Sequence, residues 1–185
     1  KEMGTKPTVV ATGGLGSVGG TEAFWAEYTL PNRAAYTETC ASVGGILWNH
    51  RMFLKSGDAK YLDAFEQTLY NGLLSGVSAK GDTFFYQNPL EATVGGGRGG
   101  RGGAPLSEDR RSAYFDVACC PANLSRLIAQ LPGLIYSARG NEIFVNLFVD
   151  SEATITVGNA TVKVSQKTAY PWDGKVSISV TSDRP

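Results

Sequence analysis

The spacing of apolar residues predicts two helices in the first half of the chain, joined by a short turn. The first covers residues 40–53 and the second residues 59–74, where Asn71-Gly72 predicts fraying near the end. The turn at residues 55–58 is so short that the two helices are expected to pack antiparallel. A third helix is predicted for residues 121–131, with Pro121 in its first turn. The apolar positions that set the helical period are Val43, Ile46, Leu47, Phe53, Tyr61, Leu62, Phe65, Leu69 and Leu73.

Short β-branched runs separated by turn residues replace this pattern towards the end of the chain. The four runs cover residues 143–149, 154–157, 161–165 and 176–180, which is typical of an antiparallel sheet. Residues 82–90 form one further predicted strand, closed by a proline. The change of pattern near residues 134–139 predicts one domain of residues 1–134 and a β segment of residues 135–185. The predicted fold class is mainly α with β.

Composition narrows the choice of partners. The 185 residues include 17 basic and 17 acidic side chains, so the formal net charge is zero. Neither nucleic acid nor an anionic membrane surface is therefore expected as a partner. No apolar run reaches membrane-spanning length, and the first residues do not form a signal peptide. Localisation stays open between the cytoplasm and the periplasm or the outside of the cell.

Two glycine-rich stretches invite stronger interpretations than their residues support. Residues 13–20 lack the Gly-Lys-Ser/Thr of a phosphate-binding loop, so a tight loop near a ligand is expected, with Glu22 in the next turn. Residues 94–105 contain two arginines without interleaved aromatic residues, which predicts a surface loop rather than an RNA-binding tract.

All three cysteines fall in two places that also carry chemistry. Glu38 and Cys40 are two residues apart, and Cys119 and Cys120 are adjacent and followed by Pro121. Three thiols and one carboxylate are a sufficient ligand set for tetrahedral zinc. The proline is expected to keep Cys120 extended and to start a helix, whose N-terminus favours thiolate over thiol. Buried, chemically inert cysteines or a strained disulfide between neighbours are the alternatives, and an odd number of cysteines argues against a disulfide framework.

Together these stretches resemble one family over nearly the whole chain: the retaining beta-L-arabinofuranosidases of glycoside hydrolase family 127. The resemblance is specific because many short motifs occur in the same order. They are Thr12-Gly13-Gly14-Leu15-Gly16-Ser17, Glu22-Ala23-Phe24, Leu30-Pro31-Asn32, Glu38-Thr39-Cys40-Ala41-Ser42, Gly57-Asp58, Glu66, Leu69-Tyr70-Asn71-Gly72, residues 85–91, residues 119–123 and Tyr170-Pro171-Trp172-Asp173-Gly174.

The resemblance implies a partial (α/α)6 barrel followed by the start of an antiparallel β-sandwich. It also implies hydrolysis of beta-L-arabinofuranosides with retention of configuration, and hence an L-arabinofuranose-containing glycan or glycoside as the partner. Retention needs a nucleophile and an acid/base, and here one cysteine and one glutamate replace the usual pair of carboxylates. The implied residues are zinc ligands Glu38, Cys40, Cys119 and Cys120, nucleophile Cys119, acid/base Glu22, and sugar contacts Glu66 and Tyr86.

Some features depart from the family pattern. The family's sugar pocket also uses histidines, whereas the single histidine, His50, lies outside the motifs and is expected to be structural. At most three helical hairpins can be drawn, so we expect this chain to be the C-terminal part of a longer enzyme, inactive without the missing N-terminal half of the barrel. A homodimer is left open.

Two functions from other classes also agree with the sequence. One is a zinc-stabilised carbohydrate-binding or interaction protein without turnover. The other is a redox protein that uses Cys119 and Cys120 as a dithiol.

Overall fold

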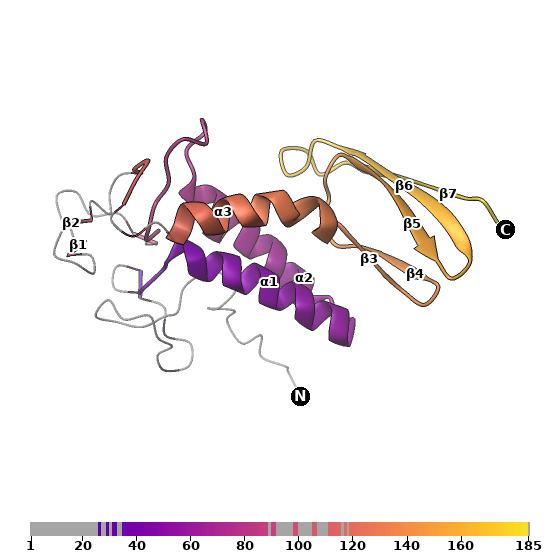
Figure 1. Ribbon diagram of the computed structural model, residues 1–185, viewed down its shortest axis with the longest axis horizontal. Helices are drawn as coiled ribbons and strands as arrows, with labels where there is room; N and C mark the ends of the chain where they lie inside the picture. The colour runs from indigo at the N-terminus through magenta and orange to yellow at the C-terminus, as the bar shows by residue number, and fades with distance from the viewer. Residues whose placement is uncertain are drawn as a thin grey trace. The chain divides into compact units, whose positions relative to one another are not determined.

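The structure is a computed structural model, and it describes residues 26, 29, 31–32, 35–88, 90–91, 98–99, 105–106, 111–115, 117 and 119–184 (Figure 1). The chain divides into two compact units, Lys1–Ile128 and Ala129–Pro185. Helices dominate the described part of the first unit, and antiparallel strands dominate the second. The domain limits expected from the sequence, residues 1–134 and 135–185, stay a prediction.

The first predicted helix is confirmed and is longer than expected. Helix α1 covers Thr39–Ser56, directly after Glu38, whose backbone is extended. It ends at Gly57, which adopts φ 71° and donates its N–H to the Phe53 carbonyl oxygen at 2.7 Å. A left-handed residue in this position ends a helix, and glycine adopts that conformation without steric cost. The chain then reverses, and α1 and α2 lie side by side in opposite directions (Figure 1).

The second predicted helix changes geometry along its length. Helix α2 covers Lys60–Gln67, and the chain continues as a π-helix, η1 (Thr68–Leu73), and a 3-10 turn, η2 (Leu74–Gly76). The uniform helix predicted for residues 59–74 is therefore wrong in its last two turns. Asn71-Gly72 lies inside the π-helix. Both residues are poor α-helix formers, so a departure from α geometry costs little there.

The core of the first unit lies where these elements meet. Phe65 and Leu73 from the second helical segment, Ile46 from α1 and Leu127 from helix α3 (Cys119–Gln130) are all completely buried. Complete burial of one such side chain contributes about 1.5–3 kcal/mol. This packing fixes the helices against one another, and with them the residues at their ends.

Residues 82–90 do not form the predicted strand. Phe84 makes isolated bridges with Val77 and with Ser112, and Gln87 makes one with Glu38. These bridges join single residues to different segments of the chain, so they do not extend into a regular β-ladder. Strands β1 (Arg98–Gly99) and β2 (Pro105–Leu106) pair antiparallel within the glycine- and arginine-rich stretch, and the rest of residues 94–105 lies outside the described residues.

The second unit contains a 3-10 turn, η3 (Leu131–Leu134), and two antiparallel sheets. Strand β3 (Tyr136–Arg139) pairs with β4 (Glu142–Val145), and β5 (Ser151–Val157), β6 (Ala160–Thr168) and β7 (Val176–Ser182) form a meander. Strands β4 to β7 confirm the four predicted runs with shifted ends. The sequence did not predict β3, because Tyr-Ser-Ala-Arg carries no β-branched residue.

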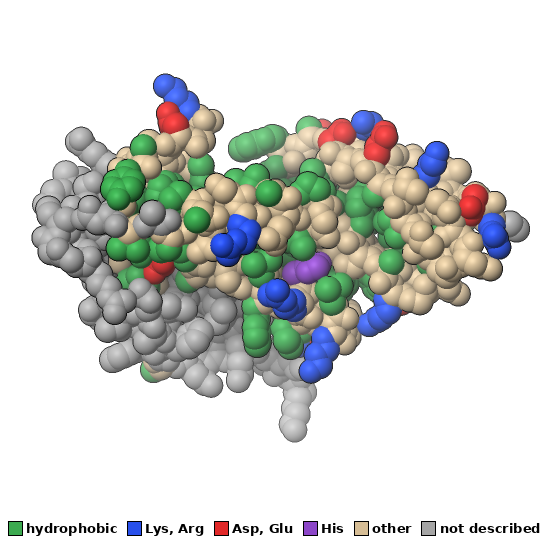
Figure 2. Space-filling view, in the orientation of Figure 1, with side chains coloured by type: hydrophobic (Ala, Val, Ile, Leu, Met, Phe, Trp, Pro, Cys, Tyr) green, Lys and Arg blue, Asp and Glu red, His purple; other side chains and the backbone are tan. Residues whose placement is uncertain are grey.

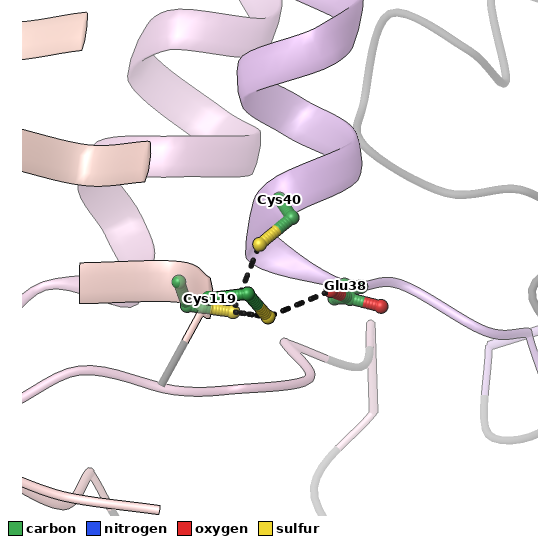
Figure 3. A group of neighbouring side chains, drawn as sticks. Glu38, Cys40 and Cys119 are labelled. Atoms are coloured by element: carbon green, nitrogen blue, oxygen red, sulfur yellow. Dashed lines mark hydrogen bonds between the residues drawn. The ribbon is translucent and has the colours of Figure 1, made fainter. Parts of the chain in front are cut away.

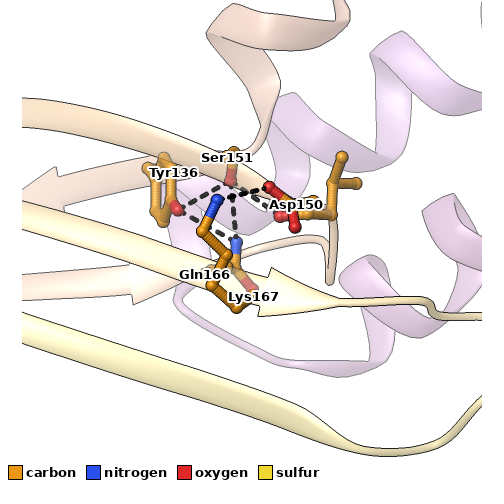
Figure 4. Close-up of polar contacts among 6 residues, drawn as sticks. Tyr136, Asp150, Ser151, Gln166 and Lys167 are labelled. Carbon is orange, nitrogen blue, oxygen red and sulfur yellow. Dashed lines mark hydrogen bonds and ion pairs between the residues drawn. The ribbon is translucent and has the colours of Figure 1, made fainter.

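A buried polar network connects the two sheets of this unit (Figure 4). Gln166 on β6 is completely buried, and its Nε2 donates to the Tyr136 hydroxyl at 3.0 Å and to the Leu147 carbonyl at 3.1 Å. The Tyr136 hydroxyl also lies 2.9 Å from the Ser151 hydroxyl. Because buried polar groups are stable only when paired, this network favours one register between the sheets.

The surface and the helices show two further features. In Figure 2, basic and acidic side chains are dispersed over the visible face rather than gathered into one patch. In the described part of the chain, no helix combines the length and the apolar character that a membrane crossing would require.

Two glycines of α1 predict opposite effects of the same substitution on stability. Gly57→Ala should lower the free energy of unfolding by about 1–2 kcal/mol, because an added Cβ disfavours its left-handed backbone. Gly44 is exposed within the helix, with no atom close enough to hinder a Cβ. Gly44→Ala should therefore raise that free energy by about 0.5–1 kcal/mol. Chemical denaturation of both variants measures the two signs, and equal signs would contradict this description of the helix.

Candidate functional site

The two cysteine-containing stretches meet at the ends of two helices. Glu38 immediately precedes α1 and Cys40 lies in its first turn, whereas Cys119 and Cys120 begin α3 (Figure 3). One ligand atom from each of these four residues lies within 4.8 Å of every other. The predicted grouping of one carboxylate with three thiols is thus present. Glu38 and Cys120 are buried, and Cys40 and Cys119 are half-buried.

The atoms of this cluster are in direct contact. The Cys40 and Cys120 sulfurs lie 3.3 Å apart, and the Cys119 and Cys120 sulfurs 3.9 Å apart. The Cys119 sulfur lies 3.6 Å from Glu38 Oε1. The three cysteines are free, so the described structure contains no disulfide between neighbours.

These separations suit a small divalent cation. With Zn–S bonds of about 2.3 Å and Zn–O bonds of about 2.0 Å, a tetrahedral site needs sulfur atoms about 3.8 Å apart and a sulfur–oxygen separation of about 3.5 Å. The contacts of Cys119 with Cys120 and with Glu38 are close to these values. The donor set also contains soft thiolates, which favour zinc over magnesium or calcium. The Cys40–Cys120 separation of 3.3 Å is shorter, but all four ligand atoms lie within 4.8 Å of one another, so these residues could hold a metal ion.

The backbone at the cysteine doublet differs from the prediction. Cys120 is helical rather than extended, because α3 begins at Cys119, two residues before Pro121. A proline in the first turn costs no hydrogen bond, since the N–H groups there have no partner within the helix. Both sulfurs therefore reach one site from the first turn of a helix, and the expectation of an extended Cys120 is wrong.

Without a cation the cluster tolerates little negative charge. The pKa of the Cys40 thiol is lowered, mainly because of its hydrogen bond with the Cys120 thiol. The same contact and burial raise the pKa of Cys120, and burial raises the pKa of Cys119. Burial thus opposes the preference for thiolate that the helix N-terminus is expected to give Cys119 and Cys120. A bound cation is what would allow all three to ionise.

Three hydrogen-bonding side chains surround the cluster. The Tyr36 hydroxyl donates to Glu38 Oε2 at 2.5 Å, and Asn123 Nδ2 donates to the Cys40 sulfur at 3.1 Å. The Tyr86 hydroxyl lies 3.5 Å from the Cys119 sulfur. Burial and this contact raise the pKa of Tyr86, so its hydroxyl stays protonated. Tyr36 and Asn123 were not predicted as site residues, although both lie within two to four residues of a ligand.

The remaining predicted residues lie in different settings. Glu66 is half-buried on α2, and in the described part of the chain it makes no hydrogen bond or ion pair with the four ligand residues. Glu22 lies outside the described residues. His50 packs edge to face on Phe65, with ring centroids 6.2 Å apart, and burial lowers its pKa. A neutral histidine in a helix interface agrees with the structural role expected for it.

Two family models cover most of the chain. Residues 3–133 match the model described as "Beta-L-arabinofuranosidase, GH127 catalytic domain", and residues 142–185 match the corresponding GH127 middle domain. Among curated proteins, a non-reducing end beta-L-arabinofuranosidase of Bifidobacterium longum is 36% identical over 172 residues. That alignment covers 92% of this chain and 25% of the relative, so the chain spans about a quarter of the relative's length.

Solved structures give the same result. A GH127 beta-arabinofuranosidase superposes with a TM-score of 0.79 at 42% identity, covering 92% of this chain and 25% of that protein. A GH127 beta-L-arabinofuranosidase from Geobacillus stearothermophilus T6 superposes with a TM-score of 0.79 at 39% identity, covering 94% and 27%. The helices of this chain and the antiparallel sheets that follow them are thus consistent with the fold of these GH127 structures.

Proposed function

The chain belongs to the glycoside hydrolase family 127 of beta-L-arabinofuranosidases, and we propose that it supplies the reacting sulfur of a retaining beta-L-arabinofuranosidase, as one part of a longer protein. The observation that carries the proposal is the cluster of one carboxylate and three thiols, in which the half-buried Cys119 lies beside the Tyr86 hydroxyl. The names of the relatives support the substrate class. We further propose that the helices form part of an (α/α)6 barrel completed by other segments of the longer protein.

Zinc is the cation that we propose for this cluster, held by Glu38, Cys40, Cys119 and Cys120. Two of their separations, 3.9 Å between the Cys119 and Cys120 sulfurs and 3.6 Å between the Cys119 sulfur and Glu38 Oε1, are close to those of a tetrahedral shell, which supports this choice. When bound, the ion would lower the pKa of the thiols, so that nucleophilic thiolate exists at neutral pH, and would stabilise the sulfur when it later leaves the sugar.

The proposed reaction proceeds by two displacements. In the first, the Cys119 sulfur attacks the anomeric carbon and forms a C–S bond, the glycosidic C–O bond breaks, and Glu22 gives its proton to the departing oxygen. In the second, Glu22 takes a proton from water, the water oxygen bonds to the anomeric carbon, and the C–S bond breaks. Two inversions at one carbon retain the configuration, and the thiolate and the protonated Glu22 are restored.

The two proposed sugar contacts, Tyr86 and Glu66, differ in how closely the structure links them to the reacting sulfur. Tyr86 has its hydroxyl next to Cys119, so it can contact both the sulfur and a sugar hydroxyl. Glu66 is only half-buried on α2, so its carboxylate is available to a sugar hydroxyl. Both assignments rest on the family resemblance together with these positions.

The direct test is a screen of the full-length protein against aryl glycosides, with zinc measured on the same preparation. Hydrolysis of a beta-L-arabinofuranoside by protein that carries about one zinc per chain is the expected result. Zinc and sugar binding without hydrolysis of any glycoside would contradict an enzyme and would favour a carbohydrate-binding protein. Thiol exchange by protein that carries little zinc would favour a redox protein.

Glu22→Gln tests the proton transfer. The variant should retain its zinc, because Glu22 is not among the four proposed ligands. Turnover should fall by about 10²–10⁴-fold for poor leaving groups, since a glutamine cannot protonate the departing oxygen. Substrates with good leaving groups need no proton and should be affected least in the first step. An equal loss for both kinds of leaving group would contradict an acid role for Glu22.

A further inference from the structure

Helix α3 carries two polar residues that lie between the solvent and the cluster of Glu38 and the three cysteines. Asn123 is half-buried and Arg126 is exposed, three residues further along the helix. Arg126 Nη1 donates to Asn123 Oδ1 at 3.3 Å, and Asn123 Nδ2 donates to the Cys40 sulfur at 3.1 Å. The three groups therefore form one continuous series of hydrogen bonds, from guanidinium to amide to sulfur.

The direction of each hydrogen bond is fixed by chemistry. A guanidinium has donors only, so the Asn123 oxygen must face Arg126. The amide nitrogen then faces Cys40, and an N–H can only donate, so the contact is most favourable when the sulfur is a thiolate. A cation hydrogen-bonded to the oxygen polarises the amide and strengthens its N–H as a donor. The series thus stabilises negative charge on the Cys40 sulfur.

The helix geometry places this series beside the cysteine doublet. Cys119 and Asn123 are four residues apart, and Asn123 and Arg126 three apart, so these side chains lie on the same side of α3. Cys40 belongs to α1. The amide of Asn123 therefore links the sulfur on α1 to the helix that supplies the other two sulfurs.

The two half-buried sulfurs have different neighbours. Cys40 accepts from an amide that is itself held by Arg126, whereas Cys119 lies beside the Tyr86 hydroxyl at 3.5 Å. We propose that Asn123 and Arg126 are positioning residues that anchor Cys40 as a permanent ligand and so leave Cys119 as the sulfur that reacts. This proposal rests on the proposed function, since it assigns different roles to two ligands of the same zinc.

The test is a double-mutant cycle on the full-length protein, with zinc affinity measured by competition with a chelating dye. Asn123→Ala should weaken zinc binding by about 10–100-fold, the usual effect of losing a hydrogen bond to a metal ligand. Arg126→Ala should weaken it by about 2–5-fold, because an exposed charge contributes little directly. In the Asn123→Ala background, Arg126→Ala should have no further effect, since Arg126 acts only through the amide.

Three further variants complete the design. Arg126→Lys keeps a cationic donor and should preserve most of the affinity. Arg51→Ala removes the same charge from an exposed position on α1 and should leave the affinity unchanged. Asn123→Asp keeps the shape of the side chain but presents oxygen to the sulfur, so it should lose at least as much affinity as Asn123→Ala. Spectra of the Co²⁺ form should show a changed thiolate charge-transfer band in this variant.

Each outcome decides between explanations. Two results would contradict the proposed roles of Asn123 and Arg126 without contradicting the zinc site. One is wild-type zinc affinity in Asn123→Asp, and the other is an effect of Arg126→Ala that persists when Asn123 is absent. Lost hydrolysis with unchanged zinc affinity in Asn123→Asp would also contradict those roles, because Asn123 would then serve the sugar. A wild-type protein that binds no zinc would contradict both the proposed metal centre and the proposed roles of Asn123 and Arg126. Arg126 is exposed, so its variants should fold and keep the cycle readable.

Discussion

Full-length protein treated with a mechanism-based reagent, such as a haloacetyl or epoxide mimic of arabinofuranose, should carry one covalent adduct on Cys119. The neighbouring Cys120 should remain unmodified, because it is completely buried whereas Cys119 is half-buried. In the proposed mechanism, only the attacking sulfur faces the anomeric carbon within bonding distance. Because the two cysteines are adjacent, fragment-ion sequencing of the labelled peptide is needed to distinguish them. An adduct on Cys120, Glu38 or Glu66 would contradict the assignment and leave the metal centre intact.

Cys119→Ser provides the kinetic counterpart of this labelling. It should abolish labelling and lower turnover by about 10⁴-fold or more, the scale seen when a nucleophile is removed. Lost activity alone would not identify the nucleophile, since Cys119 is also a proposed zinc ligand. The informative comparison is with Asn123→Ala under saturating zinc. That variant retains Cys119 and should therefore still be labelled, which separates loss of the sulfur from loss of the metal.

The helices show how much of the fold the sequence determines. The period of Val43, Ile46 and Phe53 placed α1 within a few residues, because the buried face of a helix must repeat at its own period. The π-helix at Thr68–Leu73 gave no such signal, since Leu69 and Leu73 are spaced as in an α-helix and both are buried. Its geometry depends on packing rather than on local preference.

Two β-hairpins contain a turn signal that the β-branched pattern alone does not reveal. Arg139 pairs with Glu142 across Gly140-Asn141, and Val157 pairs with Ala160 across Gly158-Asn159. Both glycines have φ of 60°, as a two-residue hairpin requires. The repeated Gly-Asn pair could have predicted the β3–β4 hairpin as well as the β5–β6 hairpin, even though Tyr136–Arg139 has no β-branched residue.

The site was predictable in its ligands and less so in its surroundings. Residue type and spacing alone grouped Glu38 with the three cysteines, because few other combinations of those residues make a tetrahedral site. The hydrogen bond from Asn123 on α3 to Cys40 on α1 joins residues far apart in the sequence, which no local pattern encodes, whereas Tyr36 donates to Glu38 only two residues away. The effect of burial on Cys119 was missed as well: the helix N-terminus is expected to favour thiolate, whereas burial raises the pKa.

Loss of one buried metal ligand should have the second large effect. Cys120→Ser should reduce zinc in the full-length protein from about one per chain to almost none, with a larger loss of affinity than the about 10–100-fold expected for an outer hydrogen bond. The folded protein should also become less stable, because the proposed metal would connect the start of α1 to the start of α3. Chelation of the wild-type protein should have the same effect. Elemental analysis and thermal unfolding of one preparation measure the zinc content and the stability.

Leu127→Ala is the matched control on the same helix. Loss of its completely buried side chain should lower the free energy of unfolding by about 2–5 kcal/mol while zinc stays bound. Full zinc in folded, reduced Cys120→Ser protein would contradict the role of Cys120 as a ligand, because zinc binding would then not depend on that sulfur.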